Sequence, residues 1–156
     1  MRILALDLSI RCPGWCVADD DQYLASGYQE NDKRATVYSR IEKNISLIKD
    51  LVTKYQIKAV WMEDTMPSGR GKTSQMLLEQ SGIVKYWCKY RKIPVYCFSI
   101  SDIKKSISGN GNAGKPEMLV AVQARGYTNI TQNDEVDAIA TWLCGLEKPF
   151  AEVANE

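Results

Sequence analysis

Two apolar runs in this chain each end in a carboxylate, and this pattern constrains the fold more than any other feature. Residues 3–6 lead into Asp7, and residues 57–62 lead into Glu63. Short runs of this kind are typical of strands that are buried on both faces of a sheet. A carboxylate at the end of a buried strand is costly unless another group compensates its charge. We therefore expect the two strands to be neighbours at the centre of a sheet, with both acids at one end.

The spacing of apolar residues predicts three strands, a helix, a strand, a helix, a strand and then further helices. The expected strands cover residues 2–8, 15–18, 23–28, 57–62 and 94–98. The expected helices cover residues 33–55, 73–92, 116–125 and 133–146, with Asn133 as the N-cap of the last one. Three short consecutive strands favour an antiparallel meander. The expected fold class is α/β, with a five-stranded mixed sheet of three antiparallel strands followed by parallel strands, flanked by helices.

The length of 156 residues favours one domain with its own core. We expect residues 1–150 to form this domain and residues 151–156 to be a short acidic tail. No apolar stretch is long enough to span a membrane, and Asp7 interrupts the apolar segment that a signal peptide would need. The five cysteines include no CxxC pair, which favours reduced thiols. These features predict a cytoplasmic protein that is not attached to a membrane.

Two further acids open the last expected helix. Asp134 and Asp137 are three residues apart and therefore share one helix face. Taken alone, they are ordinary acids of a first helical turn, where the helix dipole favours negative charge. The same face continues through Ala138, Thr141 and Gly145, whose small side chains would let the helix approach the sheet closely.

The combination of Asp7, Glu63, Asp134 and Asp137 is what suggests a site. Four converging carboxylates would repel one another, and a divalent cation is the natural remedy. Hard oxygen ligands suit Mg²⁺ or Mn²⁺. Two such ions holding one phosphate is the chemistry of many nucleases. We therefore predict a site with two divalent ions at these four carboxylates.

The chain contains no histidine. This absence excludes Ser-His-Asp and Cys-His catalysis and most catalytic zinc sites. Hydrolysis would then depend on carboxylates, lysines and metal ions. Lys104, Lys105 and Lys115 flank a glycine-rich loop that can approach a backbone closely, so they are candidates to offset charge on a reacting phosphate. The sequence leaves open whether Lys104 or Lys105 faces that phosphate.

The loop that follows Glu63 is basic but does not form an ATP site. Gly71-Lys72-Thr73 resembles the end of a Walker A motif, yet Met66 stands where its first glycine belongs, and Pro67 removes a backbone donor. ATP binding is therefore not expected. Arg70 and Lys72 are expected instead to contact DNA phosphates.

Four segments, taken in order, resemble RuvC-type Holliday junction resolvases, which have an RNase H-like fold. The segments are residues 3–9 with Gly14-Trp15, residues 60–63, residues 103–115 and residues 134–140. The resemblance implies a homodimeric endonuclease that cuts four-way DNA junctions symmetrically with Mg²⁺ or Mn²⁺. It implies metal-ligand roles for Asp7, Glu63, Asp134 and Asp137. It also implies phosphate-side roles for Lys104 and Lys115.

The loop after Glu63 departs from the family pattern. Bacterial members commonly carry an aromatic residue there, thought to stack on bases near the crossover, and Met66 stands at that place. Met66 can still wedge apolar surface between bases, but it stacks more weakly. Together with the basic residues Arg70 and Lys72, this favours a viral or phage-like relative that acts broadly on branched DNA.

Other functions fit parts of the same sequence. One is a different RNase H-like nuclease, acting on RNA–DNA hybrids, flaps or ribosomal RNA precursors. Another is a non-catalytic protein that binds branched DNA, although all four acids are present. An actin-like sugar kinase fragment is disfavoured because the chain is too short for two domains. The helix expected at residues 73–92 is a candidate dimer interface because of Trp87 and its apolar stripe, and core packing explains that stripe equally well.

Overall fold

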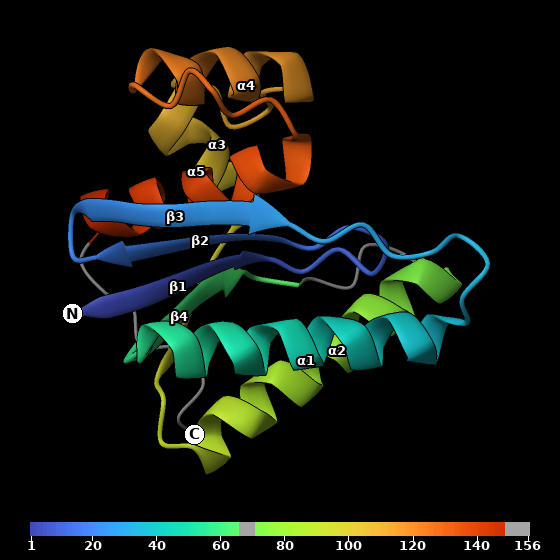
Figure 1. Cartoon of the computed structure of the whole chain (residues 1–156). Coiled ribbons are helices and arrows are strands. Elements are labelled where there is room, and N and C mark those ends of the chain that lie inside the picture. The colour runs from blue at the N-terminus through green and yellow to red at the C-terminus, as the bar shows by residue number, and fades with distance from the viewer. Residues whose placement is uncertain (66–70, 149–156) are drawn as a thin grey trace.

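The computed structural model describes residues 1–65 and 71–148, and its centre is a five-stranded mixed sheet (Figure 1). The strands are β1 (Arg2–Asp7), β2 (Gly14–Asp19), β3 (Gln22–Tyr28), β4 (Ala59–Glu63) and β5 (Val95–Phe98). Their spatial order is β3-β2-β1-β4-β5. The first three strands pair antiparallel, whereas β4 runs parallel to both β1 and β5. The expected mixed sheet is therefore confirmed, with β1 and β4 as neighbours at its centre.

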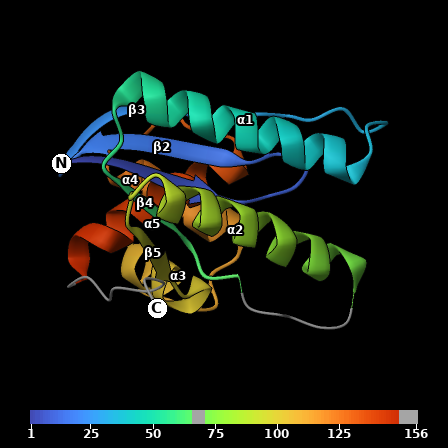
Figure 2. The same ribbon diagram turned by 90° about the horizontal axis from the view of Figure 1, so that it is seen from below.

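Helices cover both faces of this sheet (Figures 1 and 2). On one face lie α1 (Val37–Tyr55) and α2 (Lys72–Tyr90). On the other lie α3 (Ile100–Ser108), α4 (Lys115–Ala124) and α5 (Asn133–Glu147). Of these three, α5 packs directly on the strands, and α3 and α4 pack on the outer side of α5. No helix in the described ranges is long and apolar enough to cross a membrane.

Side chains of the central strands alternate between two cores. Ile3 and Ala5 belong to the core beneath α5, whereas Leu4 and Leu6 belong to the core beneath α1 and α2. Successive side chains of a strand point to opposite faces. Asp7 therefore points to the α5 face of the sheet. The same alternation places Glu63 on that face, because Trp61 lies in the core beneath α5.

The start of α1 and the N-cap of α5 differ from the sequence prediction, whereas α2 and α4 each begin within one residue of it. Helix α1 begins at Val37 rather than near residue 33, because the Thr36 hydroxyl accepts a hydrogen bond from the Ser39 N–H at 3.2 Å and caps the helix there. The N-cap of α5 is Gln132, so the prediction of Asn133 is wrong. The Gln132 side-chain oxygen accepts the Glu135 N–H at 3.0 Å, because its longer side chain can reach back over the first turn.

Candidate active site

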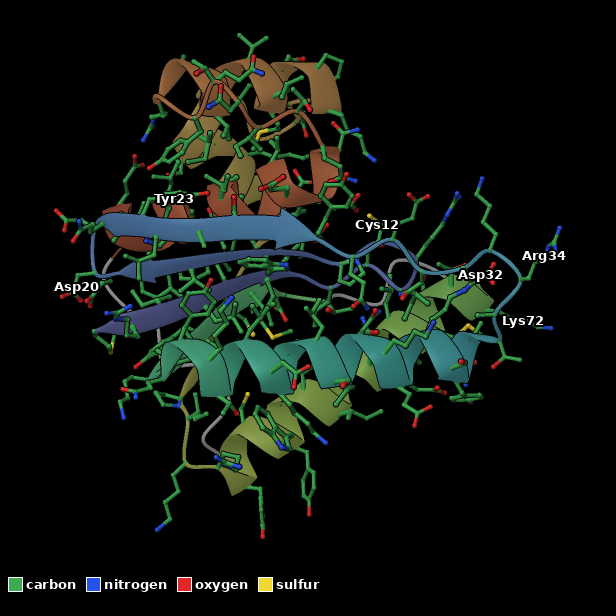
Figure 3. The ribbon with its side chains drawn as sticks, in the orientation of Figure 1. Cys12, Asp20, Tyr23, Asp32, Arg34 and Lys72 are labelled. Atoms are coloured by element: carbon green, nitrogen blue, oxygen red, sulfur yellow. The ribbon has the colours of Figure 1, made fainter. Side chains whose placement is uncertain are left out.

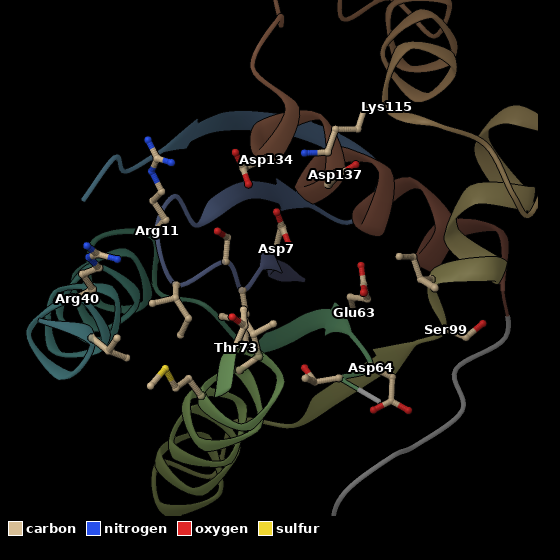
Figure 4. Close-up of a pocket in the computed structure, with 18 of the residues that line it drawn as sticks. Asp7, Arg11, Arg40, Glu63, Asp64, Thr73, Ser99, Lys115, Asp134 and Asp137 are labelled. Atoms are coloured by element: carbon tan, nitrogen blue, oxygen red, sulfur yellow. The ribbon is translucent and has the colours of Figure 1, made fainter. Parts of the chain in front are cut away.

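The parallel pairing of β1 and β4 brings the first two acids together. Leu6 pairs with Met62 in the strand register, so Asp7 and Glu63 follow at adjacent positions. Both strands end there, and both carboxylates point to the α5 face. Figure 4 shows the two side chains pointing into the same cleft from neighbouring strands. The strand-end prediction for this pair is therefore confirmed in position.

The first turn of α5 supplies the other two acids. Asp134 and Asp137 lie beside Asp7, on the side of the cleft formed by α5 (Figure 4). The cleft has a volume of about 730 Å³, and all four carboxylates line it. The side-chain amide of Gln132 donates a hydrogen bond of 2.6 Å to Asp134, which fixes that carboxylate beside the helix start.

Burial and mutual repulsion make the carboxylates of this site weaker acids than usual. Burial raises the pKa of Asp7 well above its ordinary value, and the charges of Asp137, Asp134 and Glu63 raise it further. Burial also raises the pKa of Glu63 and of Asp137, with an added contribution from a neighbouring acid in each case. Each of these charges is therefore held in a place that disfavours it.

The chemistry of the donor set fits a divalent cation. A cation placed among these oxygens would relieve the repulsion that raises the pKa of Asp7. Among the described residues, however, no three acidic, histidine or cysteine side chains are yet close enough together to ligate one ion. An ion held by three of these carboxylates would need their side chains closer together than Figure 4 draws them.

The structure separates the two candidate lysines of α3. Lys104 is half-buried, and its charge lowers the pKa of both Glu63 and Asp137, against the larger effect of burial. Lys105 is exposed, and its charge acts on Asp102, which lies outside the cleft. Lys104 is therefore the lysine of α3 that lies near the acids.

The lysine at the start of α4 also lies at the site. Lys115 lines the cleft, and its charge lowers the pKa of Asp137 against the effect of burial (Figure 4). It lies close to Asp137 because the loop before α4 brings the start of that helix over the first turn of α5. Lys115 in the cleft lining and Lys104 near Glu63 and Asp137 together form a basic wall on the α5 side of the acids.

The basic loop is described only from its last residue onward. Lys72 is the first residue of α2 and is exposed at the end of the molecule shown on the right of Figure 3. Its neighbour Thr73 lines the cleft. The predicted DNA contacts Met66 and Arg70 lie outside the described residues.

Several residues that line the cleft were missed from the sequence. They are Arg11 and Arg40 on one side, and Asp64, Thr73, Ser99 and Ser101 on the other sides. Arg11 stands only four residues after Asp7, so its proximity could have been noticed from the sequence. Arg40 could not, because its place depends on how α1 packs against the end of the sheet.

Comparison with known proteins agrees with this geometry. The chain is 29% identical over 153 residues to crossover junction endodeoxyribonuclease RuvC of Ehrlichia chaffeensis, covering 92% of this chain and 95% of that protein. It is 27% identical over 157 residues to the RuvC of Rickettsia conorii, covering 96% of this chain and all of that protein (100%).

Solved structures show the same fold. T. thermophilus RuvC, in complex with a Holliday junction substrate, matches with a TM-score of 0.74 at 18% identity over 92% of each chain. Fowlpox virus resolvase, in complex with substrate Holliday junction DNA, matches with a TM-score of 0.58 at 14% identity, over 94% of this chain and 97% of that one. These matches confirm the expected RNase H-like fold. RuvC enzymes are divalent-metal-dependent nucleases, and the oxygen donors of the cleft are of the type that such an ion prefers. Because the family model for crossover junction endodeoxyribonuclease RuvC matches residues 3–145, the chain belongs to the RuvC family of endonucleases, as the sequence predicted.

Proposed function

We propose that this chain resolves four-way (Holliday) DNA junctions, and related branched DNA, by symmetric hydrolysis of phosphodiester bonds. The observation that carries the proposal is the convergence of Asp7, Glu63, Asp134 and Asp137 in one cleft beside Lys104. Two of the structural relatives are bound to Holliday junctions, which supports the same substrate here. All five cysteines are free thiols, which supports action in a reducing cytoplasm.

The four carboxylates would hold two divalent ions, Mg²⁺ or Mn²⁺. When bound, such ions supply a water activated as nucleophile and a counter-charge for the leaving 3′ oxygen. Asp7 has all three other acids close enough to raise its pKa, so it is the residue best placed to serve both ions. Lys104 and Lys115 would donate hydrogen bonds to non-bridging phosphate oxygens as negative charge grows there. The site has no histidine, so proton transfer would fall to carboxylates and solvent.

We further propose that the active species is a homodimer that pairs through α2. Ile83, Tyr86 and Tyr90 lie on one outward face of this helix, and the two tyrosines are 74% and 76% exposed. The opposite face buries Val84 and Cys88 against the sheet, so α2 has both a core face and a free apolar face. A two-fold dimer matches the two-fold symmetry of a four-way junction.

One experiment tests the proposal against its alternatives. Purified protein is incubated with a synthetic four-way junction, a linear duplex and an RNA–DNA hybrid, in Mg²⁺, in Mn²⁺ or in chelator. Paired nicks at symmetric positions of the junction, present only with metal, are the expected result. Faster cutting of the hybrid would favour another RNase H-like nuclease. Tight junction binding without cutting in either metal would favour a non-catalytic binding protein.

A further inference from the structure

A second basic wall lies across the cleft from Lys104 and Lys115. We call it the Arg11 ledge: residues 8–12, residues 31–34, and the side chains of Arg11 and Arg40. Figure 4 shows Arg11 and Arg40 on one side of the four acids and Lys115 on another. Both arginines line the same cleft as the carboxylates. The acids are therefore flanked by cations on two sides.

A buried network of amide side chains holds the ledge in place. Asn44 of α1 donates to the backbone carbonyls of Ser9 and Ile10, both at 3.2 Å, and to the Gln80 side chain at 2.9 Å. Gln80 of α2 in turn donates to the Leu8 carbonyl at 3.2 Å. Asn44 and Gln80 are both fully buried. Burying such groups is costly unless they are fully hydrogen-bonded, so the loop after Asp7 is firmly fixed.

The same network joins the two chain segments of the ledge. The Asn31 side chain donates to Asn44 at 2.7 Å and to the Ile10 carbonyl at 3.0 Å. The Asn31 N–H donates to the Arg11 carbonyl at 2.8 Å. Arg40 binds the backbone carbonyls of residues 32 and 33, at 3.0 and 2.6 Å. The ledge is thus a rigid platform rather than two independent loops.

The arginines of the ledge keep hydrogen-bond donors that no described residue accepts. The Arg11 side chain is exposed and forms no hydrogen bond or ion pair with any described residue. Arg40 donates only some of its N–H groups, and the acceptors are neutral backbone carbonyls. Arg34 also projects outward at this end of the molecule (Figure 3). A guanidinium that lies beside acids, yet pairs with none of them, is available for an anionic ligand.

We propose that the Arg11 ledge binds DNA phosphates next to the scissile one, on the side of the cleft away from Lys104 and Lys115, with Arg11 as the principal contact. The inference rests on the proposed function. A strand that crosses the four acids carries phosphates on both sides of the cleaved bond. On the α1 side those phosphates would face uncompensated carboxylates without the ledge. Arginine suits this role because its guanidinium can bind phosphate oxygens in pairs.

The test is Arg11→Gln, measured on a fluorescent four-way junction in chelator so that no cutting occurs. The dissociation constant is expected to rise about tenfold, and the slope of log affinity against log salt should become shallower by about 0.9, as for one lost phosphate contact. Arg11→Lys should keep the salt slope because it keeps the charge. With metal present, the cleavage rate at saturating protein should fall far less than the affinity, because the lost contact holds the strand and not the reacting oxygens.

A matched control is Lys58→Gln, which removes the same charge at the opposite end of the central strands. Lys58 is exposed and lies just before β4, whose other end carries Glu63. Lys58→Gln should leave affinity and salt slope at wild-type values. The proposal would be overturned if Arg11→Gln left both the junction affinity and its salt dependence unchanged. It would also be overturned if Arg11→Gln lowered only the cleavage rate at saturating protein. A wild-type protein that binds the junction but never cuts it would instead contradict the proposed function, and the binding test of the ledge would still stand.

Discussion

Gly14 lies directly against the backbone carbonyl of Asp134, so that a methyl group on its Cα would stand 1.8 Å from that oxygen. Gly14 is also the residue opposite Asp7 in the pairing of β1 with β2. The start of α5 thus rests on the sheet at the one place where the strand next to Asp7 has no side chain. This contact sets how near Asp134 can come to Asp7.

Gly14→Ala should therefore damage both the fold and the site. The clash is with backbone atoms, which cannot rotate away, so α5 must move off the sheet. We expect a loss of about 3 kcal/mol or more in the free energy of unfolding, measured by urea denaturation, together with loss of junction cleavage. Gly82→Ala is the control, because nothing lies within 4 Å of its added methyl group and it should stabilise α2 by about 0.5–1 kcal/mol. Wild-type stability and cleavage in Gly14→Ala would contradict this account of the contact.

Asp7→Asn should separate binding from catalysis. It removes a metal ligand but no basic contact, so we expect junction cleavage to be lost while junction affinity is kept. It also removes a buried charge that three acids repel, so the melting temperature in chelator should rise by about 2–4 °C for each kcal/mol of repulsion removed. Asp50→Asn, on the exposed side of α1, should change neither property. Loss of both affinity and stability in Asp7→Asn would instead indicate that Asp7 is needed for folding.

The stabilising effect of metal should depend on pH. The folded-state pKa of Asp7, Glu63 and Asp137 is raised above the ordinary values of 3.8 and 4.5. Groups of this kind contribute full stability below those ordinary values and lose it as the pH rises through the folded pKa. At pH 8 the charged carboxylates of Asp7, Glu63 and Asp137 should therefore lower the stability of the metal-free protein. Mg²⁺ should then raise the melting temperature more at pH 8 than at pH 5.

Two other carboxylates, Asp102 and Glu147, make the protein less stable at low pH, which opposes the effect of the cluster. Comparing melting temperatures with and without metal at each pH removes their contribution. Asp102 and Glu147 have lowered pKa values, because Asp102 bonds with Lys148 and Glu147 bonds with Ser106. Their stabilisation is present above the ordinary carboxyl pKa and is lost as the pH falls. This stabilisation is the same with and without metal, so it cancels in the shift of melting temperature that Mg²⁺ causes. An Mg²⁺-induced shift of equal size at pH 5 and pH 8 would show that the raised carboxyl groups do not bind the ion.

Asn44→Leu should destabilise the protein although the new side chain is apolar. It leaves the Ser9 carbonyl and the Gln80 side-chain oxygen without their donor, and it leaves the Ile10 carbonyl with Asn31 alone. We expect a cost of about 3 kcal/mol, or a melting temperature roughly 6–12 °C lower, in thermal unfolding. Gln75→Leu, on the exposed side of α2, should stay within about 0.5 kcal/mol of wild type. A neutral Asn44→Leu would mean that the network does not fix the loop after Asp7.

The position of the acids could be predicted because it follows from the backbone alone. Alternation along a buried strand and parallel pairing are enough to bring Asp7 and Glu63 to one face at one end of the sheet. The close approach of α5 was also visible in its small residues. Gly145 confirms it, since an added methyl group would stand 2.3 Å from the Trp61 ring.

The remaining parts depended on contacts between distant segments. The second strand was expected at residues 15–18, whereas β2 begins at Gly14, where the lack of a side chain leaves room for α5. Asn44 was one polar residue in a helix, and nothing near it in the sequence shows that it is buried against the loop after Asp7. The predicted N-cap of α5 was wrong by one residue, since glutamine is rarely an N-cap.

Helix α5 is both the element that closes the core against the sheet and the bearer of Asp134 and Asp137. During synthesis, the strands bearing Asp7 and Glu63 leave the ribosome long before it does. A nascent chain that lacks α5 has one face of its sheet uncovered and lacks Asp134 and Asp137. The complete set of four acids can therefore form only in a chain that has also closed this core.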